Sequence, residues 1–134
     1  MKIALISDIH SNLEALTTVM EYCKEQNVDS LYFLGDLIGY GPSPCEVCGI
    51  MKEHMGNSVM GNHDYAVSVE NNSVLDTFNI SAREMVLWTR EQLQDRLPEY
   101  LHILADLPLI REFDRFTLVH STPYKPQEWN YIFN

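Results

Sequence analysis

Side chains that can bind a metal ion follow several apolar segments of this sequence. They are Asp8 with His10, Asp36, Asn62 with His63, and His120. Asp8 and His10 are two residues apart, so both side chains can reach one ion from an extended strand exit. The set offers carboxylate, imidazole and amide-oxygen ligands without a thiolate, which suits Mn²⁺, Fe²⁺, Zn²⁺ or Ni²⁺. The sequence therefore predicts a divalent-metal site.

Hydrophobic patterning predicts the elements that position these residues. In the first half of the chain strands and helices alternate: strand 2–7, helix 12–26, strand 29–36, helix 44–55 and strand 57–60. Residues 2–7 are apolar without alternation, as in a strand buried on both faces. Either Asn12 or Ser11 can cap the first helix. The alternation implies parallel pairing, which brings the carboxyl ends of the strands, and hence the candidate ligands, to one edge of a sheet.

The second half of the chain has a different pattern. We expect a helix over 80–93, a second helix from Pro98 to about Leu107, and two strands within 109–121. Residues 66–78 are polar and give no clear prediction. Ser81 and Glu84 resemble a capping box. The apolar side chains expected to be buried on that first helix are Ile80, Met85, Trp88 and Leu93.

The composition limits the class of protein. The chain has 134 residues, which is one domain at most, and a net charge of −10, which disfavours long nucleic acids as partners. No segment approaches the roughly 20 apolar residues of a membrane span, and the apolar run at 3–6 is too short for a secretion signal. Three cysteines do not make a disulfide framework. We therefore expect a cytoplasmic protein without membrane contact.

The order of these motifs resembles that of the calcineurin-like metallophosphoesterases. The motifs are Asp8-x-His10, Gly35-Asp36, Gly61-Asn62-His63-Asp64 and the later His120. The stretches "SDIHSNLEAL", "LGDLIGYGPSP" and "VHSTPYKP" add further similarity, most of all to the small bacterial and archaeal phosphodiesterases. The resemblance implies an α/β fold: a metallophosphoesterase-like sandwich whose first sheet is mostly parallel and flanked by helices.

The resemblance also implies a set of metal ligands and a reaction. Asp8 and His10 would bind one divalent ion, Asn62 and His120 would bind a second, and Asp36 would bridge the two. The ions would be Mn, Fe, Zn or Ni, with manganese the one to test first. A hydroxide bridging the two metals would hydrolyse a small phosphodiester or phosphomonoester.

The residues beside Asn62 would act on the substrate rather than on the metals. By resemblance, His63 would donate a proton to the leaving group or stabilise its charge, and Asp64 would orient His63. Tyr40 could border the substrate pocket or form a turn. Trp129 could line a pocket or pack against a further strand.

The pattern departs from the family in two ways. Ser11 and Ser121 stand where the family commonly has glycine, and the family's downstream Gly-His-x-His motif is absent from these 134 residues. We therefore expect residues 1–134 to be the N-terminal part of a single metallophosphoesterase domain, truncated before the second sheet is complete. The ending "QEWNYIFN" is typical of the start of a buried segment.

These departures leave other functions open. In the family, the two histidines of the Gly-His-x-His motif each complete one metal site. The chain could therefore be a non-catalytic metal-binding fragment or subunit that forms a homo-oligomer or takes these two ligands from a complementing chain. It could also be an interaction module whose polar strand ends are purely structural. A separate pair, Cys45 and Cys48, could form a redox or zinc motif but is better explained as small, semi-buried residues on a helix.

Overall fold

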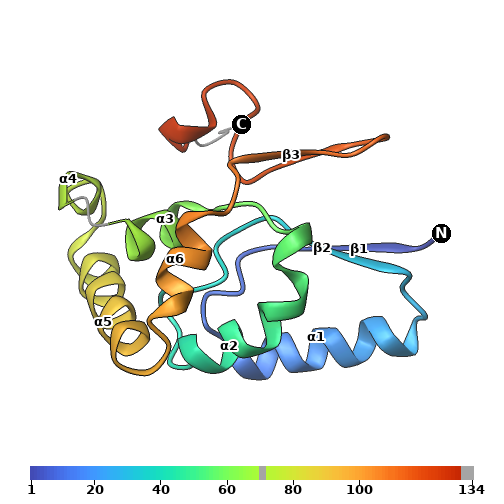
Figure 1. Ribbon diagram of the computed structural model, residues 1–134, viewed down its shortest axis with the longest axis horizontal. Coiled ribbons are helices and arrows are strands. Elements are labelled where there is room, and N and C mark those ends of the chain that lie inside the picture. The colour runs from blue at the N-terminus through green and yellow to red at the C-terminus, as the bar shows by residue number, and fades with distance from the viewer. Residues whose placement is uncertain (70–71, 131–134) are drawn as a thin grey trace.

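A computed structural model describes residues 1–69 and 72–130 of the chain (Figure 1). The elements follow one another as β1 (Ile3–Ile6), α1 (Leu13–Glu25), β2 (Ser30–Phe33), α2 (Pro44–Met51), the 3₁₀ helix η1 (Lys52–Asn57), α3 (Asn62–Ser68), α4 (Asn72–Leu75), α5 (Ile80–Arg96), α6 (Glu99–Ala105), β3 (Ile110–Glu112), β4 (Thr117–Val119) and the 3₁₀ helix η2 (Pro126–Glu128). This mixed α/β arrangement confirms the predicted fold class.

The first sheet is a parallel pair of strands. β1 pairs with β2 in a register that runs from Ile3 opposite Ser30 to Ile6 opposite Phe33. The strand predicted over 57–60 is reduced to one parallel bridge between Phe33 and Ser58, because η1 continues α2 as far as Asn57. The Val59 N–H still donates to the Phe33 carbonyl at 3.0 Å, so this segment follows the edge of the sheet.

Helices and a hairpin cover this sheet from two sides. Figure 1 shows α1 and α2 below the β1–β2 pair and the β3 hairpin above it. β3 and β4 are the two strands predicted within 109–121, and they pair antiparallel. The hairpin lies against the first sheet through Tyr32, whose ring contacts Phe113 at 5.0 Å and Phe116 at 5.1 Å. The two short sheets thus form two layers, held together by aromatic rings.

The exposed face of β1 differs from the prediction of a strand buried on both sides. Leu5 keeps 57% of its surface exposed, and three of the four β1 residues are only partly buried. With two strands in the sheet, part of that face has no neighbouring element over it among the described residues. The predicted burial of the ending applies mainly to residues 131–134, which lie outside the described part of the chain.

The helix ends show which capping predictions hold. Asn12 caps α1, its Oδ1 accepting the Ala15 N–H at 3.0 Å. The capping box predicted at Ser81 is wrong: Asn79 is the cap, its Oδ1 accepting the Ala82 N–H at 2.9 Å, although α5 begins at Ile80 as predicted. The buried stripe also differs from the prediction, and Ile80 is 78% exposed. The side chains that α5 buries are Ala82, Val86, Thr89 and Leu93, at helical spacing.

One further helix agrees with the sequence. α6 covers Glu99–Ala105, within the helix expected after Pro98. None of the helices in the described residues is long and apolar enough to span a membrane.

Candidate metal centre

The exits of β1 and β2 are bound to each other by main-chain hydrogen bonds. The Asp8 N–H donates to the Gly35 carbonyl at 3.2 Å, and the His10 N–H donates to the Asp36 carbonyl at 3.0 Å. Asp8, His10 and Asp36 all have positive φ values, of 56°, 48° and 53°. Non-glycine residues rarely adopt this left-handed conformation, which concentrates at functional sites. The backbone therefore turns sharply at the point where the candidate ligands stand.

Asp36 lies at the middle of the candidate site. Its Oδ1 accepts the main-chain N–H of His63 at 2.9 Å. Its Oδ2 lies 3.6 Å from His10 Nε2 and 3.4 Å from His120 Nε2. A Cβ on Gly61 would overlap Asp36 Oδ1, so glycine is what permits this approach. One buried carboxylate oxygen thus faces two imidazole nitrogens from opposite ends of the chain.

Main-chain carbonyls hold both imidazole rings in place. His10 Nδ1 lies 3.2 Å from the Ile38 carbonyl, and His120 Nδ1 lies 2.6 Å from the Leu34 carbonyl. When Nδ1–H donates to a carbonyl, the Nε2 lone pair is free to coordinate, which is how metal-binding histidines are usually oriented. Both Nε2 atoms face Asp36, so the rings present their ligand atoms to the same point.

All seven residues singled out in the sequence gather here. Asn62 Oδ1 lies 3.2 Å from His120 Nε2, and Asp8 Oδ1 lies 3.6 Å from His10 Nε2. Two groups have ligand atoms within 4.8 Å of one another: His10, Asp36 and His63, and Asp8, Asp36 and His120. Both groups share Asp36, and their carboxylate and imidazole donors fit two divalent ions. Asp8 falls in the group with His120, while its printed contact of 3.6 Å is with His10, so it lies near both imidazoles.

The charges of this cluster suit cation binding. Burial works to raise the pKa of Asp36, but the hydrogen bond and positive charge of His120 outweigh it and hold that pKa below its usual value. Burial works to lower the pKa of His120, and its hydrogen bond and ion pair with Asp36 instead raise that pKa to about 9. The Asp36 carboxylate is therefore ionised and paired with the imidazolium of His120. A bound cation could replace the positive charge of that imidazolium.

His63 lies at the start of α3 with an almost fully buried side chain. Burial lowers the pKa of His63 to about 4, and the negative charge of Asp36 offsets only part of this effect. Its Nδ1 is buried and has no hydrogen-bond partner among the described residues. The ring contacts Tyr40 at 4.5 Å and Phe78 at 4.9 Å between centroids. His63 is thus a neutral imidazole held between aromatic rings.

Asp64 is fully buried and bonds to the main chain instead of to the His63 ring. Its Oδ1 accepts the N–H groups of Leu37 at 2.9 Å and Ile38 at 3.3 Å, and its Oδ2 accepts that of Gly61 at 3.0 Å. Burial, together with the charge of Asp36, raises the pKa of Asp64 to about 7, against these hydrogen bonds. Asp64 therefore joins the β2 exit to the start of α3. Its position three residues after Gly61 is the capping-box spacing that could have indicated this role.

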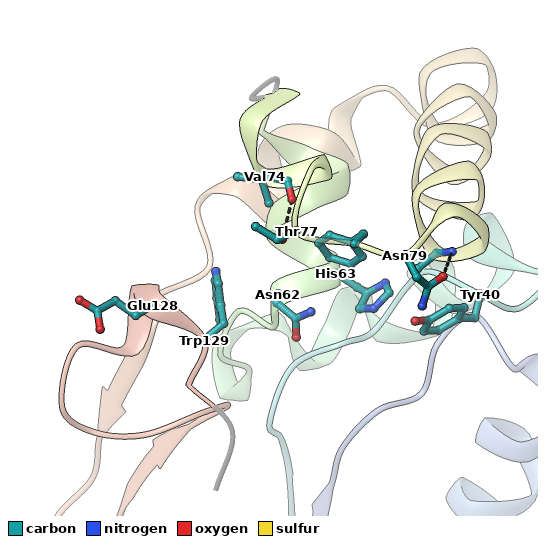
Figure 2. A pocket seen from close by; sticks show the side chains of 10 residues that line it. Tyr40, Asn62, His63, Val74, Thr77, Asn79, Glu128 and Trp129 are labelled. Carbon is teal, nitrogen blue, oxygen red and sulfur yellow. Dashed lines mark hydrogen bonds between the residues drawn. The ribbon is translucent and has the colours of Figure 1, made fainter. Parts of the chain in front are cut away.

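A cavity of about 340 Å³ opens beside His63 and Asn62 (Figure 2). Tyr40 and Trp129, whose roles the sequence left open, both line it, whereas Tyr124 is 76% exposed and does not. Thr77, Phe78 and Asn79 also line it. Sequence reasoning missed Thr77 and Phe78 because segment 66–78 has no periodic pattern, and it missed Asn79 because the predicted helix was given a different cap.

The cysteine pair lies apart from this centre. Cys45 and Cys48 are free and buried on α2. Burial raises the pKa of both thiols, most strongly that of Cys48, so neither is poised to react. This agrees with the structural interpretation of the pair.

Sequence comparison with known proteins points to the family that the sequence motifs resemble. The family model described as "Calcineurin-like phosphoesterase" matches residues 1–132. An uncharacterized protein of Methanocaldococcus jannaschii is 38% identical over 98% of this chain and 54% of its own length. A symmetrical bis(5′-nucleosyl)-tetraphosphatase of Vibrio vulnificus is 28% identical over 87% of this chain and 43% of its own.

Solved structures agree. The crystal structure of a metallophosphoesterase from Sphaerobacter thermophilus matches all of this chain and 52% of its own, with a TM-score of 0.80 and 41% identity. The chain thus spans about half the length of the relatives that it matches.

Proposed function

Because this chain belongs to the calcineurin-like phosphoesterase family, we propose that it hydrolyses a phosphoester at a centre of two divalent metal ions. The observation that carries the proposal is the position of Asp36. Its Oδ2 lies between the Nε2 atoms of His10 and His120, at 3.6 and 3.4 Å. A carboxylate oxygen flanked by two oriented imidazoles suits a ligand shared between two ions.

Five side chains would hold the metals. His10 and Asp8 would bind on one side of Asp36, and His120 and Asn62 on the other. When bound, two divalent ions lower the pKa of a shared water and neutralise charge on the phosphoryl oxygens. We propose Mn²⁺, Fe²⁺, Zn²⁺ or Ni²⁺, in keeping with the mixed oxygen and nitrogen donors.

His63 would act on the ester itself. Its main-chain N–H is fixed to Asp36 Oδ1, which places the imidazole beside the metal ligands and at the wall of the cavity. Because Nδ1 is enclosed beside Gly39, Nε2 is the atom that can reach a substrate oxygen. A neutral ring would carry its proton there and donate it towards the leaving oxygen. Asp64 would keep His63 in position through the backbone.

The substrate would be a small phosphodiester or phosphomonoester. Relatives named bis(5′-nucleosyl)-tetraphosphatase make phosphorylated nucleotides the first compounds to test. One observation favours a second candidate, a metal-binding subunit that needs another chain: the Asp8 side chain is 56% exposed, so the centre is open where a second chain could add ligands.

The decisive test is hydrolysis of bis-p-nitrophenyl phosphate by the purified chain with Mn²⁺. We expect turnover, and we expect Asp36→Asn to lower kcat/KM by roughly a hundredfold or more, because the amide cannot supply the shared negative charge. Asp95→Asn, which changes an exposed carboxylate on α5, should leave kcat/KM unchanged. A folded chain whose activity equals that of Asp36→Asn would contradict catalysis by this chain alone and favour the subunit.

A further inference from the structure

We propose that the cavity beside His63 binds an uncharged planar group of the substrate, of the nucleobase type, while the phosphate lies at Asp36. This inference rests on the proposed phosphoesterase function, because the phosphate must be held at the metal ligands for the rest of the substrate to reach the cavity. The inference specifies which chemical group the substrate carries in addition to its phosphate.

The cavity joins the metal ligands directly. Asn62 and His63 line it, and Asn62 Oδ1 lies 3.2 Å from His120 Nε2. Its volume of about 340 Å³ is at the lower end of the range for small-molecule sites, which suits one ring system rather than a long chain. A group esterified to a phosphate at Asp36 would therefore enter it without crossing open solvent.

Aromatic rings form opposite walls of this cavity. Figure 2 shows Trp129 on one side of Asn62, with His63 and Tyr40 on the other. Phe78 also lines the cavity and meets the His63 ring edge to face, at 4.9 Å and 84°. Aromatic faces bind planar rings by stacking, and the gain for a nucleobase is largely independent of which base it is.

Two polar side chains at the cavity have one hydrogen-bonding role left each. Thr77 donates its hydroxyl proton to the Val74 carbonyl at 2.7 Å, so its oxygen can only accept a further bond. Asn79 Oδ1 caps α5 by accepting the Ala82 N–H, so its Nδ2 group is what remains to donate. An occupant with both a donor and an acceptor on its edge would satisfy the pair, as a nucleobase does and a plain phenyl ring does not.

The charge of the lining opposes a second phosphate in the cavity. Among the described lining residues Glu128 is the only one that carries a full charge, and no lysine or arginine is included. Glu128 is paired with Lys125 at 2.7 Å. Phosphate groups are usually bound by arginine, lysine or main-chain N–H groups, so an uncharged occupant fits this lining better than a polyphosphate arm.

The test compares two ligands that differ only by a base. Calorimetric titration of the Mn²⁺-loaded chain with adenosine 5′-monophosphate and with ribose 5-phosphate gives both Kd values. We expect the nucleotide to bind about tenfold more tightly, within the range of one base stacked on aromatic side chains. Trp129→Leu should abolish that difference and Trp129→Phe should retain most of it. Equal Kd values for the two ligands in the unmodified chain would overturn the proposal.

Controls separate this inference from the function on which it rests. Tyr124→Leu removes an exposed aromatic ring outside the cavity and should leave the ratio of Kd values unchanged. Phe78→Leu, on a different element, should also reduce the ratio, so the test does not depend on the folding of one variant. A nucleotide preference without hydrolysis of bis-p-nitrophenyl phosphate would contradict the catalytic proposal alone. Hydrolysis without a nucleotide preference would contradict only this one.

Discussion

At the scale of single residues, the candidate centre contains an ion pair between Asp36 and His120 that a bound metal ion would break. Asp36 and His120 stabilise each other's charged forms at 3.4 Å in a largely buried place. A divalent cation must displace the proton of His120, since only the neutral imidazole coordinates. The protein without metal should therefore respond to pH in a way that this pair determines.

We predict that the free energy of unfolding of the metal-free chain falls as the pH rises from about 6.5 to about 9. The folded-state pKa of His120, about 9, lies above its ordinary 6.5, so its contribution is complete below pH 6.5 and is lost through pH 9. Asp64, with a folded-state pKa of about 7, acts in the same direction up to that pH. The His63 change lies lower, between pH 4 and 6.5.

Urea unfolding after EDTA treatment, at constant ionic strength and several pH values, measures this slope. His120→Gln should flatten it above pH 7.5, where Asp64 has already titrated. If the free energy of unfolding of the unmodified chain rises with pH over this range, His120 is not protonated in the folded state.

At the scale of elements, α3 positions two of the candidate site residues. Its first turn carries Asn62 and His63, and Asp64 fixes that turn to the β2 exit. Its other end is held by Arg90 of α5, which donates from Nε to the Val67 carbonyl at 3.0 Å and from Nη2 to the Ala66 carbonyl at 2.7 Å. A seven-residue helix is marginal by itself, so these contacts at both ends give α3 its fixed place.

Arg90→Lys should lower kcat with little effect on KM. Lysine keeps the charge but cannot reproduce the fork of N–H groups on neighbouring carbonyls. We expect a loss of about 1–3 kcal/mol in the free energy of unfolding from the carbonyls left unpaired. Steady-state kinetics and urea unfolding measure the two effects.

Arg83→Lys is the matched control, because Arg83 lies on the same helix in an exposed pair with Asp76. Arg83→Lys should change neither kcat nor the free energy of unfolding. An unchanged kcat in Arg90→Lys would mean that the carbonyls at the end of α3 do not influence His63.

The elements that the sequence predicted well are those whose signals are local. α1 and its cap at Asn12, the helix after Pro98 and the hairpin within 109–121 follow from periodicity and turn residues. The prediction of a strand over 57–60 was wrong because η1 extends to Asn57. The apolar run "SVM" could not indicate this helix. The start of α5 was predicted correctly at Ile80, but its cap was not, because Ser81 and Asn79 are both acceptable caps and tertiary packing selects between them.

At the scale of the whole molecule, the candidate ligands come from four separate segments: the exits of β1 and β2, the start of α3, and the end of β4. Ions bound among them would tie these segments together in the folded state only. Ligand binding that is confined to the folded state stabilises the protein in proportion to the logarithm of ligand concentration.

We therefore expect Mn²⁺ to raise the melting temperature of the chain. At a free concentration of a hundred times Kd the gain would be about 2.7 kcal/mol for one site. Asp36→Asn should lose most of this increase, whereas Asp95→Asn should retain it. Thermal unfolding followed by circular dichroism, with and without EDTA, measures the shift; an identical shift in Asp36→Asn would contradict a site centred on Asp36.

The part of the candidate centre formed by Asp8, His10 and Asp36 could be foreseen, because the parallel strands β1 and β2 bring their carboxyl ends to one edge. His120 follows a strand of the separate antiparallel sheet, so this rule does not account for its place.

The surroundings of the centre could not be foreseen. Phe78 and Trp129 line the cavity, and Arg90 holds the far end of α3, through tertiary packing that leaves no periodic trace in the sequence. The roles assigned to single residues, and the placement of 1–134 within one domain, stay predictions.

The contact between His120 and the Leu34 carbonyl also has a consequence in time. It joins residues 86 positions apart, so the centre cannot close until the hairpin that carries His120 has been made. Between synthesis of Asp36 and His120 the ribosome adds 84 residues (120 − 36), which at 5–20 residues per second takes roughly 4–17 seconds. Throughout that interval the nascent chain carries Asp36 without His120, so the candidate ligands Asp8, His10 and Asp36 are synthesised well before the last one.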